Sequence, residues 1–336
     1  MKLLNECLER LLDEGLASSI AVRVGRFDTA LADAFLSSEG SINEYTRFDM
    51  ASVTKVMATT PLALMAIEQG ALTLDTPVSA FFRDPRELTI RHLLTHTIGI
   101  GHKPLNKEGN TYGNIADYIL SIPADIPAGT DVLYSCPGFI LLGKILEQLY
   151  GAPLDALFMS RIAAPLQMTR TRFLPGDDEN TVNSNISRAE RGLVNDYNCR
   201  FLGGVAGNAG LFSCIADTEK YVRALLHGGA PLLKRETLAM AFQNYTPGMS
   251  ESRALGFVYV DGKYAQTGRL FPAGSIGHCG HTGQSIFFNP ESGLYVIILS
   301  DATRATVVQY GGERYDLVMD MRARIHNALA DSGLSQ

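Results

Sequence analysis

Strand-like segments lie near both ends of the chain and the middle is helical, and this distribution constrains the fold most. Helical apolar spacing at residues 3–15 and 315–330 predicts a helix at each end. The expected strands, read from short apolar runs between turn residues, are 20–24, 28–35, 257–260, 284–288 and 294–300. These elements favour an α+β fold in which both chain ends build one antiparallel sheet, flanked by helices, around an inserted helical lobe.

The same pattern predicts how the chain divides. No long Gly, Ser or Pro linker interrupts residues 1–336, so we expect a single catalytic unit. Its sheet lobe would comprise about 1–50 plus 205–336, and its helical lobe about 51–204. The hairpin near the start is expected to turn through Gly25-Arg26-Phe27, and Asp217 is expected to cap a helix that runs through Leu226.

Composition excludes several function classes. The net charge is -6 and the 29 Lys and Arg are scattered, which argues against nucleic acid or an anionic membrane surface as a partner. The first ten residues are too polar for a signal peptide, and no run of about 18 apolar residues is present. Five cysteines at irregular spacing favour free thiols. We therefore predict a cytoplasmic protein that acts on a small molecule.

Ser52 and Lys55 form the first candidate for chemistry. A helix is expected over 52–69, with a kink or break at Pro61, and a separation of three places both side chains on one face. The Ser52 N–H at the helix start would be free to stabilise an oxyanion. Lys55 would need desolvation or a nearby cation to lower its pKa. Because about one such Ser and Lys spacing is expected by chance in a chain this long, the pair alone decides nothing.

Further motifs follow in a distinctive order along the chain. Tyr134-Ser135-Cys136 precedes a helix expected at 138–150, and His281-Thr282-Gly283 is expected on the penultimate pair of strands. With Ser52 and Lys55 these motifs resemble the penicillin-recognising serine hydrolases, which include class C β-lactamases, D-Ala-D-Ala carboxypeptidases and related esterases. The segments that share this resemblance are 48–55, 72–78, 89–99, 134–139, 203–212, 280–284 and 293–296.

The resemblance implies a role for each motif residue. Ser52 would attack a carbonyl to form an acyl-enzyme, while Lys55 and Tyr134 would move its proton to the leaving group. The N–H groups of Ser52 and Gln284 would hold the oxyanion, and water would release the acyl group. We also expect substrate contacts from Thr282, which can hydrogen-bond a polar group, and from Gly283, which would leave a strand edge open. No cofactor or metal is expected.

Two positions depart from the family. His281 stands where members that act on β-lactams or D-Ala-D-Ala peptides commonly have Lys, so a permanent cation for the substrate carboxylate is lost. Cys136 stands where they have Asn, and a thiol is a poor partner for a substrate amide. Both residues remain candidate substrate contacts, but their chemistry favours an esterase or a specialised amidase over an efficient β-lactamase.

Other candidates are weaker. His92 and His96, one helical turn apart, are the single pair with metal-ligand spacing, and we interpret them as structural. Cys136 could be proposed as a nucleophile with His281, but nothing in the sequence makes its thiol more reactive than Ser52. Asn195-Asp196 and Asn208 occupy places where similar sequences often have His, so a metal or proton-transfer role there is absent.

Three functions remain open. The first is hydrolysis of an ester or of a cell-wall-derived amide, such as a muropeptide fragment. The second is β-lactam or D-Ala-D-Ala hydrolysis, and the third is a non-catalytic sensor or scaffold on the same fold. Retention of Ser52, Lys55 and Tyr134 favours the first over the third. The sequence predicts neither the oligomeric state nor the size of the pocket.

Overall fold

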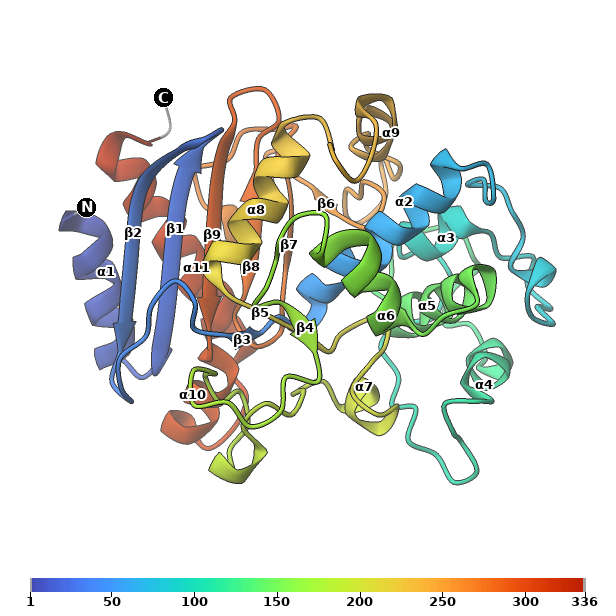
Figure 1. Cartoon of the computed structure of the whole chain (residues 1–336), viewed down its shortest axis with the longest axis horizontal. Coiled ribbons are helices and arrows are strands. Elements are labelled where there is room, and N and C mark those ends of the chain that lie inside the picture. Colours follow the sequence, from blue (N-terminus) through green and yellow to red (C-terminus); the bar gives the residue numbers. More distant parts are fainter. Residues whose placement is uncertain (1, 335–336) are drawn as a thin grey trace.

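The computed structural model describes residues 2–334 and contains an antiparallel sheet of six strands in the order β2-β1-β9-β8-β7-β6 (Figure 1). The early strands β1 (Ser19–Arg26) and β2 (Thr29–Ser37) form a hairpin at one edge. The late strand β9 (Leu294–Ser300) pairs with β1, so the sheet joins the two ends of the chain. The predicted α+β fold is confirmed.

Both faces of this sheet are buried, which explains why the central strand β9 is almost wholly apolar. Val22 and Ile298 belong to a core cluster with α1 (Lys2–Asp13) and α11 (Tyr315–Leu329). The adjacent residues Ala21 and Ile297 point to the opposite face, into the larger core that includes α8 (Ile215–Leu226). Successive side chains of a strand alternate between faces, so helices cover the sheet on both sides.

The remaining strands and helices position the middle of the chain. The late edge of the large sheet holds β6 (Val258–Tyr259), β7 (Ile276–Cys279) and β8 (Ser285–Phe288). A small sheet has the order β3 (Phe48–Asp49), β5 (Leu211–Ser213), β4 (Arg172–Phe173). The other helices are α2 (Thr60–Glu68), α3 (Ile90–Leu94), α4 (Ile115–Ser121), α5 (Cys136–Tyr150), α6 (Leu154–Phe158), α7 (Tyr197–Phe201), α9 (Arg235–Ala241) and α10 (Ala302–Tyr310).

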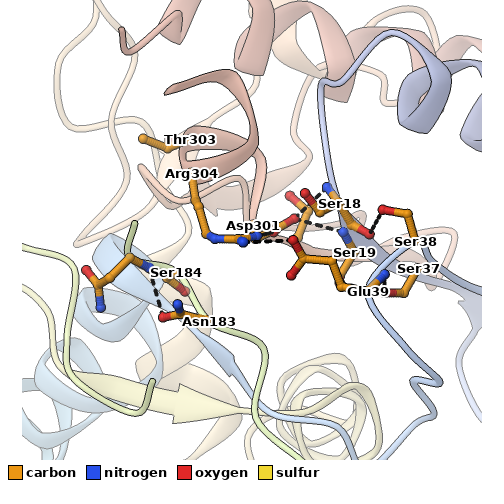
Figure 2. Close-up of polar contacts among 12 residues, drawn as sticks. Ser18, Ser19, Ser37, Ser38, Glu39, Asn183, Ser184, Asp301, Thr303 and Arg304 are labelled. Atoms are coloured by element: carbon orange, nitrogen blue, oxygen red, sulfur yellow. Dashed lines mark hydrogen bonds and ion pairs between the residues drawn. The ribbon is translucent and has the colours of Figure 1, made fainter. Parts of the chain in front are cut away.

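A buried polar network fixes the start of β1 to the start of α10 (Figure 2). Asp301 accepts hydrogen bonds from the N–H groups of Ser18 at 2.9 Å and Ser19 at 2.8 Å. Arg304 donates to Asp301 at 2.9 Å and to Glu39, which follows β2, at 2.7 Å. Burial raises the pKa of Asp301 above its ordinary value, against the opposing effect of these hydrogen bonds and of the Arg304 charge. The network ties together segments almost 300 positions apart in sequence.

The helix expected to begin at Ser52 is irregular before Pro61. A 3-10 turn spans Ala51–Val53, a wider π-type turn spans Lys55–Thr59, and the regular helix α2 begins at Thr60. Pro61 lies in the first turn of α2, where no N–H is required. The backbone stays helical into α2, so the predicted interruption takes the form of a wider π-type turn that precedes the proline.

Three local predictions are wrong. The first hairpin turns at Phe27 and Asp28, because Arg26 pairs with Thr29. The helix α8 begins at Ile215 and follows Cys214, since the Asp217 side chain instead accepts the Arg170 N–H at 2.7 Å. The motif 281–283 lies in the turn between β7 and β8, not on a strand.

The division into two lobes at residues 50 and 205 stays a prediction. None of the helices within residues 2–334 combines the length and apolar character needed to cross a membrane. The five cysteines are free thiols, four of them buried. Their cellular compartment stays a prediction.

Candidate active site

The segment that precedes the π-type turn holds Ser52 in a constrained position. Ala51 has a φ of +45°, a conformation that costs a non-glycine residue free energy. Asp49 fixes this turn, because its carboxylate accepts the Ala51 N–H at 2.8 Å and the Asn195 N–H at 2.6 Å. Ser52 is the second residue of the 3-10 turn, where an N–H has no partner inside the turn. Its side chain lines a cavity, so the hydroxyl is placed for reaction.

Lys55 is fully buried beneath Ser52. Its Nζ donates to the Ser52 Oγ at 2.9 Å, to the Asn208 carbonyl at 3.0 Å and to the Cys136 Sγ at 3.5 Å. An ammonium has three N–H donors, so these acceptors match the protonated form. The predicted contact between Ser52 and Lys55 is present in the structure.

The electrostatics around Lys55 differ from the sequence-based expectation. Burial lowers the pKa of Lys55, as expected, but the net shift is upward. The Cys136 sulfur and the Tyr134 oxygen, which become anions when ionised, favour the ammonium form, and a hydrogen bond with Tyr134 adds to their effect. The lowered pKa that Lys55 would need to act as a base is therefore not what its surroundings favour. Lys55 is a cation that can stabilise negative charge on Ser52 or Tyr134.

Tyr134 precedes α5, whose first turn is capped by the Ser135 side chain on the Gly138 N–H at 3.1 Å. The Lys55 Nζ lies 5.0 Å from the centroid of the Tyr134 ring. Burial raises the pKa of Tyr134 above its ordinary value, although the Lys55 charge and hydrogen bonds with Lys55 and Ser52 act in the opposite direction. The structure thus brings Ser52, Lys55 and Tyr134 together around one point.

Cys136 is the first residue of α5 and also lines the cavity. Burial is the main reason that its pKa lies above the ordinary value, although Lys55 acts to lower it. A neutral buried thiol is a poor nucleophile, so the geometry favours Ser52 over Cys136 for attack. The Sγ is positioned as a weak acceptor for Lys55.

The turn between β7 and β8 brings the C-terminal motif to Ser52. Thr282 is buried, and its hydroxyl lies within hydrogen-bond distance of the Asp49 carbonyl, 3.0 Å, and the Gln284 side chain, 2.6 Å. Gly283 has a φ of +119°, and a Cβ there would clash with Ser300. Glycine is therefore required by the turn and by packing against β9, not by an open strand edge. Direct substrate contacts of Thr282 and Gly283 stay predictions.

Arg322 on α11 holds the turn between β7 and β8 through hydrogen bonds to its backbone. Its side chain is fully buried and donates to the carbonyls of Gly280 and Gly283 and to the side chain of Gln266. The guanidinium thus fixes two backbone carbonyls on either side of Thr282. The turn that presents the Gln284 N–H is consequently held by side-chain hydrogen bonds as well as by β7 and β8.

Gly280 marks where this turn meets the segment that holds Ser52. A Cβ added at Gly280 would lie 2.7 Å from the Met50 carbonyl oxygen, 3.2 Å from the Gln284 Cβ and 3.3 Å from the Ala51 Cβ. Only a residue without a side chain allows this approach. The two segments that supply the predicted oxyanion donors therefore pack directly against each other.

The cavity above Ser52 has a volume of about 650 Å³. Ser52, Tyr134 and Cys136 line its floor together with polar residues such as Asp196. His281 lies at the rim, where its side chain is 42% exposed, its Nε2 is 3.3 Å from Glu313, and its ring stacks on Tyr315 at 5.7 Å between centroids. The space suits a small organic substrate.

Sequence reasoning missed three residues around Tyr134. His96 packs on the Tyr134 ring with 4.4 Å between centroids, and its Nδ1 accepts the Ser135 N–H at 3.0 Å. His278 and Arg253 also face the ring, at 6.1 Å and 5.5 Å. His96 lies inside a family-like segment, which was a usable signal, whereas the segment around Arg253 matched nothing.

The two histidines predicted to be structural have separate roles. His92 accepts the Thr89 N–H at 3.1 Å at the start of α3, while His96 contacts Tyr134. Within residues 2–334 no group of three His, Cys, Asp or Glu side chains has the geometry to hold a metal ion. Asn208 donates to Asp196, the neighbour of Asn195, at 3.0 Å.

Comparison with known proteins decides the family. The sequence profile of the family described as Beta-lactamase matches residues 4–318. The chain belongs to the beta-lactamase family. Its members are serine hydrolases of one superfamily with the penicillin-binding proteins, so the predicted family is confirmed.

Relatives of this beta-lactamase-family protein have several names. A protein of Escherichia coli K12, provisionally named D-alanyl-D-alanine carboxypeptidase, is 28% identical over 309 residues, covering 78% of this chain and 70% of that protein. The N-acetylmuramyl-L-alanine amidase of Bacillus subtilis is 25% identical over 313 residues, covering 78% and 69%.

Solved structures agree with the fold of this beta-lactamase-family protein. A penicillin-binding protein homologue from Caulobacter crescentus matches with a TM-score of 0.77 and 15% identity, covering 98% of this chain and 97% of that one. The hydrolase EstCE1, described as having promiscuous acyltransferase activity, matches with a TM-score of 0.74 and 21% identity, covering 97% and 98%. At these identities the likeness concerns the fold.

Asp49 gives the protein a pH-dependent stability that can be measured. Burial raises the pKa of Asp49 to about 6 from an ordinary 3.8, despite hydrogen bonds from Asn195 and Ala51. Because the folded state holds this proton more tightly than the unfolded chain, the stabilisation is complete below pH 4 and is lost as the pH rises through 6. Relative to Asp49→Asn, the wild type should lose about 2 kcal/mol between pH 4 and pH 7.

Urea unfolding of both proteins at intervals of half a pH unit tests this expectation. Other titrating groups contribute equally to the two proteins and cancel in the difference. The replaced carboxylate oxygen weakens hydrogen bonding in Asp49→Asn, but that loss does not vary with pH. A difference in unfolding free energy that stays constant from pH 4 to pH 7 would contradict the shifted pKa.

Proposed function

We propose that this protein is a serine hydrolase that works through a Ser52 acyl-enzyme on an ester or a cell-wall-derived amide. The observation that supports it most is the fully buried Lys55 ammonium, which donates to the Ser52 Oγ at 2.9 Å on the floor of the cavity. Preorganised charge next to a nucleophile contributes to acyl transfer because the transition state is more anionic than the ground state.

The chemistry follows from the groups around Ser52. The Tyr134 phenolate takes the hydroxyl proton of Ser52 while the Oγ forms a bond with the substrate carbonyl carbon. The carbonyl electron pair moves to oxygen, where the N–H groups of Ser52 and Gln284 stabilise it. Collapse of this intermediate breaks the bond to the leaving group, which receives the proton from Tyr134. Water then repeats the sequence on the acyl-enzyme and releases the acid.

Cys136 supports an ester or a specialised amide over a β-lactam as substrate. Its thiol contacts Lys55, where many family members place an Asn that also binds the substrate amide. A site without that amide partner discriminates less against simple acyl groups. The relatives named as a carboxypeptidase and an amidase support cell-wall fragments as one class of substrate. Hydrolysis of β-lactams is the second candidate, because the fold and Ser52 suit it equally.

One experiment separates these functions. Wild type and Ser52→Ala are incubated with a p-nitrophenyl acyl ester, a chromogenic cephalosporin and a muropeptide, and turnover is followed with intact-protein mass. We expect ester or muropeptide turnover, with an adduct on the wild type that Ser52→Ala lacks, and a loss of at least about 10³-fold in rate.

The other outcomes point elsewhere. Equal ester turnover by Ser52→Ala would exclude the mechanism. Fast turnover of the cephalosporin alone would select the β-lactamase alternative. A stable adduct without turnover would favour a sensor, and no adduct with any of the three compounds would favour a scaffold.

A further inference from the structure

Arg253 lies in the segment between α9 and β6 and reaches the catalytic tyrosine from outside every family motif. Its side chain is buried, 4% exposed, and lines the cavity that holds Ser52. The guanidinium carbon lies 5.5 Å from the centroid of the Tyr134 ring, compared with 5.0 Å for the Lys55 Nζ. Two cations from distant parts of the sequence therefore face one phenol.

Only one nitrogen of the Arg253 guanidinium has an ion-pair partner among the described residues. Its Nη2 pairs with Glu251 at 2.8 Å, and Glu251 is 32% exposed. Within residues 2–334, the buried Nε and Nη1 atoms have no hydrogen-bond partner. Burying a cation with two unpartnered nitrogens costs free energy unless another group interacts with it. The ring of Tyr134 is such a group, and its ionised form would interact far more strongly than its neutral form.

The other titratable groups around Tyr134 are neutral near pH 7. Burial and the Arg253 charge hold the pKa of His96 and of His278 well below the ordinary value. Burial keeps the Cys136 thiol protonated. Among the described groups, the charged ones that face the ring are therefore Lys55 and Arg253, with Glu251 behind Arg253. Asp196 also lines the cavity, and its charge acts on Lys55 and Cys136.

The residue at position 281 does not supply the second cation beside the Tyr134 ring. His281 is at the rim, pairs with Glu313 at 3.3 Å and stacks on Tyr315. Members of the family that have Lys at this position hold a permanent cation there. In this chain the permanent cation nearest to the Tyr134 ring, apart from Lys55, comes from a different segment.

We propose that Arg253 is a positioning residue that stabilises the Tyr134 phenolate and thereby sets the pH at which Ser52 is acylated. This inference rests on the proposed function. Tyr134 first releases its proton to water in the cavity, and the phenolate then accepts the Ser52 proton as the acyl bond forms. In this role Arg253 exchanges no proton; its charge lowers the cost of the first step.

The test measures Tyr134 directly as well as the rate. The Tyr134 pKa is followed by NMR of protein labelled with ¹³Cζ-tyrosine, with Tyr134→Phe assigning the resonance. Acylation by a p-nitrophenyl ester is followed by single-turnover mass measurements from pH 6 to pH 12, because burial places the pKa of Tyr134 above its ordinary value. In Arg253→Met we expect the Tyr134 pKa and the acidic limb of the rate profile to move up together by at least about one unit, a tenfold loss at neutral pH.

Two further variants make the result specific. Glu251→Gln removes the carboxylate that compensates Arg253, so both quantities should move down. Arg253→Lys keeps the charge, so its Tyr134 pKa and its rate profile should stay close to those of the wild type. This comparison remains usable if Arg253→Met proves unstable. Arg269→Met serves as a matched control, because Arg269 is 66% exposed and pairs with Asp331. Its profile should equal that of the wild type.

The outcomes separate this inference from the proposed function. A Tyr134 pKa unchanged in Arg253→Met and Glu251→Gln, or a rate loss equal at every pH, would overturn it. If the Tyr134 pKa shifts as expected but the wild type forms no Ser52 adduct, the proposed function fails while the effect of Arg253 on Tyr134 stands.

Discussion

Lys55→Met is expected to slow acylation of Ser52 by at least about 10³-fold. In the wild type the ammonium donates to the Ser52 Oγ at 2.9 Å and lies 5.0 Å from the centre of the Tyr134 ring. Methionine keeps much of the volume but removes the charge from both groups. The Tyr134 phenolate then loses its nearest cation, and the Ser52 alkoxide that develops during attack loses its hydrogen bond.

The measurement is single-turnover formation of the Ser52 adduct with a p-nitrophenyl ester, followed by mass. Lys2→Met is the matched control, since Lys2 is 88% exposed and pairs only loosely with Glu6 at 3.7 Å. Thermal unfolding shows whether the fold survives loss of the buried contacts to Cys136 and Asn208. Acylation by folded Lys55→Met within tenfold of the wild type would mean that Tyr134 activates Ser52 without Lys55.

Gly280→Ala is expected to reduce the rate of acylation by at least about 10²-fold. The added methyl group would lie 2.7 Å from the Met50 carbonyl, so either the turn after β7 or the segment that holds Ser52 must move. Ala51 is already in a strained conformation and cannot absorb the displacement cheaply. Because both predicted oxyanion donors lie at this contact, their separation should increase.

Gly312→Ala is the control for this substitution, because a Cβ at Gly312 has nothing within 4 Å. Rates, KM and thermal unfolding are measured for both variants. The loss in Gly280→Ala should fall mainly on the rate constant, since the contact that is disturbed lies between the two predicted oxyanion donors, which act in the transition state. A loss expressed only in KM would place the oxyanion donors elsewhere.

Sequence patterns predicted the helices and strands whose ends are set by neighbouring residues in the sequence. The strand β9 has the predicted bounds 294–300, because an apolar run follows the turn at Gly293 directly. The strand β7 escaped prediction, since it is only four residues long and contains Gly277 and His278. It is a strand because it pairs with β8, and pairing is a tertiary property that no short window reveals.

The residues of the candidate site likewise fall into those that the sequence could predict and those that only the fold reveals. Ser52 and Lys55 could be paired from a spacing of three, and Tyr134 could be added from its motif. Arg253 could not, because it lies in a segment without regular structure and meets Tyr134 only through the fold. The charge state of Lys55 was also beyond reach, since it depends on its burial and on Cys136 and Tyr134, which only the fold brings to it.

The position of β9 in the sheet has a consequence for synthesis of the protein. A growing chain exposes β1 and β2 first, but the neighbour that completes β1 is translated about 270 residues later. The serine and its lysine are made early, whereas Gly280, Gln284 and the supporting Arg322 are made much later. A nascent chain therefore holds an incomplete reactive centre until β9 has been inserted and α11 has been made.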